Sequence, residues 1–363
     1  MATTNYPRAK IVINGQTFIP DTVNFTASGY FHGDKLDTHL QMFSTSIGTP
    51  FWTGLGYGAP IQVFGGDASS GTTVWESTPF FDGLLNEIDL DFDTGKASLT
   101  CVDRVQLLQQ LKLYQTFPNQ TGAEIISNIA GQVGMTAQVT GDTHLAGILY
   151  SKDHIKLQHG DLSKVTTGWD LISYIARETG NVAFVKGTVV YVQPLVIDPT
   201  NGFTVIYKEP TTVGQVTTWT VQSNVWKLHL KHSLLVSKDI TVQVNYFHSK
   251  KGVAGKATAG PVRSKSNMNQ SNFIYAPYAN INADQAQAKA NSIYRELTLH
   301  EWTLDFETAM DFSVLPYQTV AIPGLLVGQM FYINELTFHI DQTAGGTMSL
   351  VCKTHQPEND TNA

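Results

Sequence analysis

The chain has 363 residues, of which 42% are hydrophobic and 15% are charged, and it carries a net charge of −7 at pH 7. This length predicts two to four domains, and the acidic balance argues against a general affinity for nucleic-acid phosphate. The sequence has no cationic, apolar leader and no apolar run near the ~18 residues of a membrane span, so we expect a soluble protein made in the cytoplasm without membrane insertion.

The first hundred residues predict a series of short strands. Apolar and β-branched runs are broken by Gly, Pro and Asp, and the runs fall at residues 10–14, 38–45, 60–64, 84–92 and 97–102.

A change to helical periodicity begins near residue 121. Thr121 precedes a run with apolar residues at helical spacing, and Gly134 ends it. The pattern returns in residues 167–180, where each match is shifted by 46 positions, as from Ile126 to Ile172. Each helix leads into a strand, and a hairpin at residues 186–188 follows the second strand. Residues 121–195 therefore predict a small α/β unit built from two related helix–strand pieces.

The second half of the chain predicts strands and one long helix. Strands are expected at 225–230 and 239–247, and Asn282 caps a helix that ends near residue 297. A stretch without periodicity lies at 248–266, and its basic residues are Lys250, Lys251, Lys256, Arg263 and Lys265. We expect residues 358–363 to form a frayed tail.

The end of the first β region resembles the end of the chain. Four blocks recur in the same order: 38–43 with 302–306, 60–63 with 316–320, 86–88 with 334–336, and 99–102 with 350–353. The only two cysteines, Cys101 and Cys352, occupy the same place in the pattern, and their apolar surroundings predict buried thiols. The chain holds either two related β units or two unrelated sheets of similar composition. Three chains with two related units each would present six units around one axis.

Two helical segments resemble those of the phage late control D family of tail hubs. The first is TGAEII…AGQVGMT at residues 121–136, and the second is WDLI…ARETG at 169–180, followed by a hairpin. The closing order is similar too: an Ala-rich helix near 283–293, Leu-Pro at 315–316, Pro-Gly at 323–324 and YINEL at 332–336. This family includes the baseplate hubs of contractile-tailed phages and resembles the amino-terminal half of the secretion-system spike protein VgrG.

The resemblance implies a mainly β fold with an α/β insert. Each chain would form two similar antiparallel, tail-tube-like β-barrels and a small α/β domain, and three chains would form a pseudo-sixfold ring. The expected boundaries are 1–110 for the first barrel, 111–222 for the α/β insert, 223–248 with 288–357 for the second barrel, and 249–287 for a basic loop and connecting segment.

The function implied by the resemblance is structural and not enzymatic. A homotrimer in the baseplate of a virion tail would link the sixfold tail tube protein to the threefold central spike protein, with tape measure and baseplate wedge proteins as further partners. DNA would pass through its channel during ejection without specific binding. Because the sequence carries no β-helical extension of the VgrG kind, the spike is expected to be a separate protein.

Two rows of polar residues are the candidate channel lining. Glu87, Asp89, Asp91 and Asp93 alternate with apolar residues, which on a strand places the carboxylates on one face. The matching row in the second copy is Glu335, Thr337, His339 and Asp341. One interpretation is an ordinary solvated face. The other is a channel lining, since carboxylates repel DNA phosphate weakly whereas Lys or Arg would bind it.

The remaining candidate features are weaker. The basic stretch at 250–265 is either a loop that docks on an acidic surface of a partner or a solvated loop. His144, His154 and His159 lack ligand-spaced Cys or carboxylates, so surface histidines are favoured and neither a metal nor a cofactor is predicted. Phe51, Trp52 and Tyr57 resemble a sugar-binding platform, although an interface loop or core edge fits this Gly-rich stretch better.

Two alternative functions stay open. The same fold could serve as the hub of a bacterial contractile injection system or a gene-transfer particle. The alternative from another class is a carbohydrate-binding or cell-wall-degrading β-domain enzyme. The sequence contains no phosphate loop, nucleophile elbow or isolated carboxylate pair that would support an enzyme.

Overall fold

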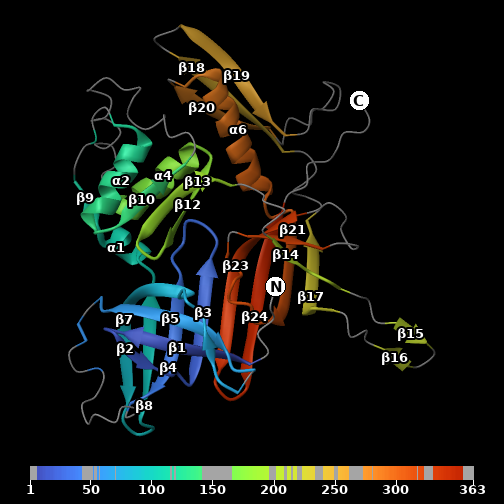
Figure 1. The fold of residues 1–363 in the computed structure, drawn as a ribbon. Helices are drawn as coiled ribbons and strands as arrows, with labels where there is room; N and C mark the ends of the chain where they lie inside the picture. The colour runs from blue at the N-terminus through green and yellow to red at the C-terminus, as the bar shows by residue number, and fades with distance from the viewer. Residues whose placement is uncertain are drawn as a thin grey trace.

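A computed structural model describes most of the chain. The described residues are 6–42, 52, 55–56, 58–69, 71–114, 117, 120–140, 166–195, 202–207, 211–213, 216–218, 223–233, 240–248, 252–260, 273–279, 281–316, 318–322 and 330–354. In Figure 1 a large sheet forms the lower half of the molecule, an α/β unit lies above its first part, and a small sheet with one long helix lies at the top.

The large sheet is built from both ends of the chain. Its first part contains β1 (Pro7–Ile13), β2 (Gln16–Phe18), β3 (Thr22–Ser28), β4 (Lys35–Gln41), β5 (Pro60–Asp67), β6 (Val74–Trp75), β7 (Phe81–Asp91) and β8 (Lys96–Val102). Its second part contains β14 (Gly202–Thr204), β17 (Val225–His232), β21 (Trp302–Ala309), β22 (Thr319–Ala321), β23 (Met330–Asp341) and β24 (Gly345–Thr354). The main path runs β17-β21-β24-β23-β3-β4-β8-β7-β5-β1-β2, so the two parts meet where β3 pairs with β23.

The sequence blocks that recur form strands with the same neighbours in both parts. The order β4-β8-β7-β5 in the first part matches β21-β24-β23-β22 in the second. One step further out, β3 lies beside β4 as β17 lies beside β21. The large sheet thus contains one strand arrangement twice.

The strand registers agree as closely as the strand order. Cys101 in β8 lies opposite Leu36 of β4, and Cys352 in β24 lies opposite Leu304 of β21. Both cysteines are buried free thiols, and burial together with the nearby Asp37 carboxylate raises the pKa of Cys101 to about 12.

A register shift occurs at the same place in the two long strands. The ladder of β7 with β8 skips one residue between Leu85 and Glu87, and the ladder of β23 with β24 skips one between Ile333 and Glu335. The extra residue is Asn86 in the first case and Asn334 in the second. Because a bulge is a specific local feature, its repetition in both parts supports a duplication over a chance similarity.

The α/β unit follows the first part of the sheet. It contains α1 (Val105–Gln110), β9 (Lys112–Leu113), α2 (Gly122–Gln132), β10 (Thr136–Val139), β11 (Thr166–Thr167), α4 (Gly168–Glu178), β12 (Asn181–Lys186) and β13 (Val189–Pro194). The predicted helices and their following strands are confirmed. Each helix begins with a capping box, formed by Thr121 with Glu124 in α2 and by Thr167 with Asp170 in α4.

The third group of elements differs from the prediction. Strands β18 (Thr241–His248), β19 (Val253–Ala259) and β20 (Phe273–Ala279) form a separate sheet, which packs against α6 (Ala283–Thr298). We expected residues 241–248 in the second barrel, but β18 pairs with β19 and β20 instead. We also expected residues 253–259 to be irregular, whereas they form a strand of alternating exposed and buried residues. A further short hairpin is formed by β15 (Thr211–Val213) and β16 (Val216–Thr218).

The α/β unit is anchored to the large sheet by the β3–β4 connection. The backbone N–H of Phe31 donates to the Ala183 carbonyl at 2.8 Å, and the indole N–H of Trp169 donates to the Phe31 carbonyl at 3.1 Å. The Arg177 guanidinium lies 4.5 Å from the centre of the Phe31 ring. These contacts fix the position of α4 relative to β3 and β4.

Helix α6 is anchored to the end of α4. Lys289 Nζ lies 2.8 Å from the Glu178 carboxylate, and the Arg295 guanidinium donates to the Gly180 carbonyl at 2.9 Å. Cations at a helix C-terminus also interact favourably with its dipole. In the described part of the chain, no helix is both long and apolar enough to cross a membrane.

Candidate channel face and sheet junction

One face of the large sheet is polar and the other is the main core. Residues alternate between the two faces along each strand, as in β1, β4 and β8, where every second residue is buried. The buried face brings residues of both parts into one apolar cluster, which includes Phe25, Leu99, Leu304, Phe338 and Leu350. The opposite face carries the predicted polar rows.

The first acidic row lies largely where the sequence predicted it. Glu87, Asp89 and Asp91 are exposed residues of β7, while Ile88 and Leu90 between them point toward the core and are half-buried. Asp93 is different. It lies in the turn that follows β7, where its backbone N–H donates to the Asp91 carboxylate, so only three carboxylates share the strand face.

The second row lies on β23. Glu335 and Asp341 are half-buried and His339 is exposed. The His339 ring is hydrogen-bonded to the Asn24 side chain of β3, across the junction of the two parts. Asp341 accepts hydrogen bonds from Thr343 and from the Ala344 backbone, and these bonds lower the pKa of its carboxyl to about 2.

Lysines share this face with the acidic residues, which the sequence analysis did not anticipate. Lys96 of β8 lies directly opposite Asp91, and Lys35 of β4 forms an ion pair of 2.9 Å with Asp37. Lys231 is an exposed residue of β17. Lys96 follows the acidic row directly in the sequence, across the β7–β8 turn, whereas the strand order was needed to place Lys35 and Lys231 on this face. The face therefore carries mixed charge.

Most of the predicted basic docking stretch lies outside the described residues. This applies to Lys250, Lys251, Arg263 and Lys265. Lys256 is an exposed residue of β19 and lies opposite Asn245. The predicted histidines at 144, 154 and 159 and the aromatic residues Phe51 and Tyr57 also lie outside the described part.

Trp52, by contrast, contributes to the edge of the main core. Its ring meets Phe92 edge-on at 6.5 Å, and it packs against the buried cluster. Within the described ranges, no group of three or more His, Cys, Asp or Glu side chains is placed to hold a metal ion.

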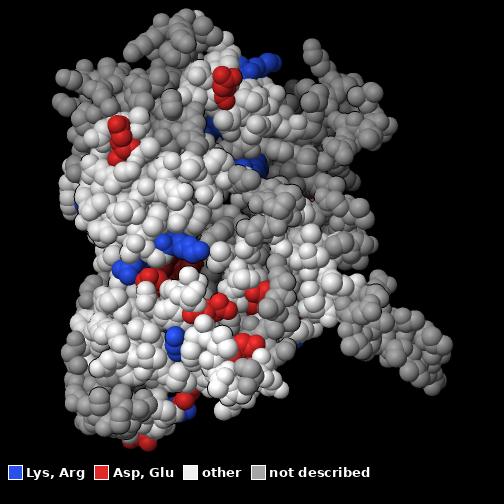
Figure 2. Space-filling view, viewed as in Figure 1, with Lys and Arg blue, Asp and Glu red and all other residues white. Residues whose placement is uncertain are grey.

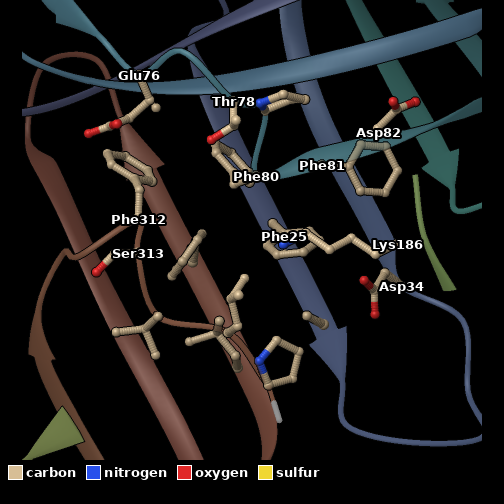
Figure 3. Close-up of a pocket in the computed structure, with 18 of the residues that line it drawn as sticks. Phe25, Asp34, Glu76, Thr78, Phe80, Phe81, Asp82, Lys186, Phe312 and Ser313 are labelled. Atoms are coloured by element: carbon tan, nitrogen blue, oxygen red, sulfur yellow. The ribbon is translucent and has the colours of Figure 1, made fainter. Parts of the chain in front are cut away.

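A pocket of about 640 Å³ lies beside the junction of β3 and β23. Its floor is aromatic: Phe80 stacks on Phe312 at 5.4 Å, and Phe25 and Phe338 complete the cluster. Figure 3 shows Phe25, Phe80 and Phe312 lining the pocket, with Glu76 and Asp82 at its edge. In Figure 2, acidic side chains gather with Lys and Arg around the hollow between the lower sheet and the α/β unit. The sequence analysis missed this pocket, since its walls come from segments that lie far apart in the chain.

Two carboxyls lie at one end of this pocket, the buried Asp103 and the half-buried Asp34. Burial raises the pKa of Asp103 to about 7, and burial together with the Asp103 charge raises the pKa of Asp34. Asp34 accepts a hydrogen bond from the Ser28 backbone N–H at 3.0 Å, and Asp103 accepts one from Val105 at 3.1 Å. The backbone N–H of Asp103 also donates to the Asp34 carbonyl at 3.1 Å, and this bond ties the β3–β4 connection to the start of the α/β unit.

Comparison with solved structures identifies the architecture. The tail protein of Neisseria meningitidis MC58 matches with a TM-score of 0.66 and 11% identity, covering 98% of this chain and 97% of that one. A 43 kDa tail protein of prophage MuSo2 from Shewanella oneidensis matches with a TM-score of 0.59 and 12% identity, covering 95% and 97%. The chain has the fold of phage tail proteins.

A secretion-system protein shares this fold. A component of the Escherichia coli type VI secretion system, whose own similarity is to the phage T4 tail proteins gp27 and gp5, matches with a TM-score of 0.51 and 11% identity. The match covers 96% of this chain and 77% of that one. No family model matches the chain, and no curated protein matches its sequence. The predicted tail-hub fold is thus supported, while membership of the late control D family stays a prediction.

Proposed function

We propose that this chain is the hub of a phage-type tail, a homotrimer that links a sixfold tail tube to a threefold central spike. One observation carries the proposal: a single chain contains the same strand arrangement twice, with the same register and the same bulge. Three such chains provide six equivalent sheet units, whereas each element that occurs once in the chain is present in three copies. One ring can then meet sixfold symmetry on one face and threefold symmetry on the other.

The proposed channel face is the polar face of the large sheet. The apolar face is already occupied by the main core, so only the polar face is available to line a central opening. Its mixture of carboxylates, hydroxyls and a few lysines lets DNA pass without specific binding, because a surface with few unpaired cations releases few counterions from DNA. The pair energy between two charges ~10 Å apart in water is only about 0.4 kcal/mol, so the face discourages adhesion without blocking passage.

The two ends of the ring would contact different partners. The sheet of β18–β20 and α6 extends away from the large sheet in Figure 1, and Lys256 is an exposed residue of its strand β19. We propose that the basic residues from Lys250 to Lys265 dock on an acidic surface of the tube, spike or tape measure protein. We propose the baseplate of a virion tail as the location, with synthesis in the host cytoplasm and no enzymatic role.

Mass in solution tests the central proposal. Light scattering of the purified chain should give three times its mass of 39.8 kDa, and its complex with a candidate spike protein should contain three copies of each. A monomer at every concentration, alone and with the spike, would contradict the hub assignment.

A second candidate has a specific observation in its favour. The match to a type VI secretion component indicates that this fold also occurs in injection systems, so a hub of a contractile injection system or a gene-transfer particle is the alternative. The geometry would be the same and the cargo different. Electron microscopy of particles that contain the chain separates the injection system from the other two, because only a phage or gene-transfer particle has a DNA-filled capsid.

A further inference from the structure

Among the strand edges of the large sheet that have no neighbour in the described residues, two belong to counterparts of strands that pair with each other inside the chain. Strand β17 ends the main path of the sheet and pairs only with β21. Strand β7 pairs with β5 only as far as Leu84, so the outer edge of its acidic half, from Glu87 to Asp91, has no partner strand in the described ranges. In the duplicated arrangement, β17 corresponds to β3 and β7 corresponds to β23. Those two counterparts pair with each other within the chain.

The internal ladders define which residues correspond. Phe25 of β3 lies opposite Leu36, and Leu230 of β17 lies opposite Leu304, the counterpart of Leu36. Phe25 and Leu230 are therefore equivalent. In the long strands, Glu87 follows the bulge of β7 as Glu335 follows that of β23. Counting from these two residues makes Leu90 equivalent to Phe338.

We propose that the acidic half of β7 in one copy pairs antiparallel with β17 of the next copy, in the register of the internal β3–β23 junction. Phe338 lies opposite Phe25 in the internal junction, so Leu90 would lie opposite Leu230 of the next copy. This pairing rests on the proposed trimer and assigns the residues that join its copies.

The proposed register places carboxylates opposite a lysine and a histidine. Internally, Thr337 lies opposite Thr26, and their equivalents are Asp89 and Lys231. Internally, His339 lies opposite Asn24, and their equivalents are Asp91 and His229. All four residues of the proposed intermolecular pairs are exposed in the single chain. Two neutral pairs inside the chain thus correspond to an Asp–Lys and an Asp–His pair between chains.

Burial of the apolar residues supports the same pairing. At the internal junction Phe25 is 3% exposed, and Leu336 and Phe338 are each 1% exposed. Their equivalents at the two edges are Leu230, Ile88 and Leu90, which are only half-buried in the single chain. A neighbouring strand would complete their burial as it does at the internal junction, which adds a hydrophobic contribution to the charge pairs.

The charges also exclude the competing arrangement. Two copies of the β7 edge would place carboxylates opposite carboxylates, and two copies of the β17 edge would place lysines and histidines together, so twofold pairing is disfavoured. Of the pairings between these two edges, that leaves β7 with β17. Such heterologous contacts repeat from copy to copy and produce a closed ring when the rotation allows it.

Charge reversal at the central pair tests this junction. We expect Lys231→Asp and Asp89→Lys each to convert the trimer to monomer in light scattering, because each puts like charges directly opposite one another. The double variant Lys231→Asp/Asp89→Lys restores one opposite-charge pair per junction and should restore the trimer. Lys112→Asp is the matched control, since it makes the same charge change at an exposed residue of the α/β unit, and it should remain trimeric.

A mixture of the two single variants gives a sharper result. Junctions between unlike variants pair opposite charges, whereas junctions between like variants pair like charges. A ring of three must contain at least one like junction, so the mixture should give dimers and few closed trimers, in contrast to the double variant. Trimeric single variants, or a double variant that stays monomeric while folded by circular dichroism, would overturn the proposed pairing.

Cross-linking provides an independent readout. Leu90→Cys/Leu230→Cys places two cysteines opposite each other between copies, and mild oxidation should give covalent dimers and trimers on a non-reducing gel. Each single cysteine variant should stay monomeric on that gel, because the native cysteines are buried. A trimeric parent without cross-links would overturn only this strand pairing. A monomeric parent would also overturn the proposed hub.

Discussion

At the scale of single residues, the buried carboxyl of Asp103 predicts a dependence of stability on pH. Its pKa is raised to about 7 by burial, whereas an unfolded Asp titrates near pH ~4. The folded chain therefore keeps a proton that the unfolded chain releases. The stabilising contribution of this group is fully present below pH ~4 and is lost as the pH rises toward about 7.

Asp103→Asn should remove this dependence. The amide is neutral at every pH and its oxygen can still accept the hydrogen bond from Val105. We expect a gain on the order of 1–3 kcal/mol in the free energy of unfolding at pH 8 and little change at pH 4. Denaturant titrations at pH 4 and pH 8 measure the free energy of unfolding of the variant and the parent. The assignment would be contradicted if the free energy of unfolding changed as much between the two pH values in the variant as in the parent.

Gly65 predicts a steric effect at the contact between the two parts of the sheet. A Cβ atom at this position would lie 2.4 Å from Cγ of the Phe312 ring, which stacks on Phe80. Gly65→Ala must displace that ring, and we expect a loss of about 1–3 kcal/mol in the free energy of unfolding. Gly131→Ala on α2 is the control. No atom lies within 4 Å of its Cβ position, so it should stabilise by about 0.5–1 kcal/mol.

At the scale of elements, the capping boxes of α2 and α4 predict equal effects on two equivalent helices. The hydroxyls of Thr121 and Thr167 each accept a hydrogen bond of 3.1 Å from the backbone N–H three residues later. Thr121→Ala and Thr167→Ala should each cost about 1 kcal/mol. Thermal unfolding measures both, and Thr→Ser at either position should recover most of the loss because the hydroxyl is kept.

These caps also explain which elements the sequence could predict. A Thr followed by an acidic residue three positions later, an apolar stripe and a closing Gly are all local signals, so both helices and their following strands were predicted correctly. Helix α1 was missed because its six residues are too short to show a period. Strand β19, with the sequence VAGKATA, was missed because Ala and Gly have low strand propensity and only the neighbouring β18 gives it a partner.

The candidate site was predictable only in part, because the sequence reveals local features and not the pairing of distant strands. Alternation along β7 correctly placed Glu87, Asp89 and Asp91 on one face. Asp93 was misplaced, because turn hydrogen bonds to Asp91 end the strand before it. The pocket at Phe25 and Phe312 and the placement of Lys35 and Lys231 on the polar face depend on strand order, which is not a local property of the sequence.

At the scale of the whole molecule, the duplication determines how the sheet is assembled. The sequence predicted two similar β units from four short blocks, and the strand order shows that they are also continuous, joined at β3 and β23 in one sheet. A single sheet with one core has one polar face across both units. If three copies extend it into a ring, this polar face becomes the inner surface that DNA meets.

That inner surface predicts how DNA binding should respond to charge. Glu335→Lys changes a polar-face residue on β23, inside the chain and away from the proposed junction between copies, so the trimer should persist. Three new lysines in the channel should bind single-stranded oligonucleotides that the parent does not bind, with an affinity that falls steeply with salt because each phosphate contact releases a counterion. Fluorescence anisotropy at low and moderate salt measures this binding.

Glu296→Lys on the exposed side of α6 is the control. It makes the same charge change outside the channel and should bind the oligonucleotides much more weakly. Equal binding by the two variants would mean that the polar face of the sheet does not line the channel.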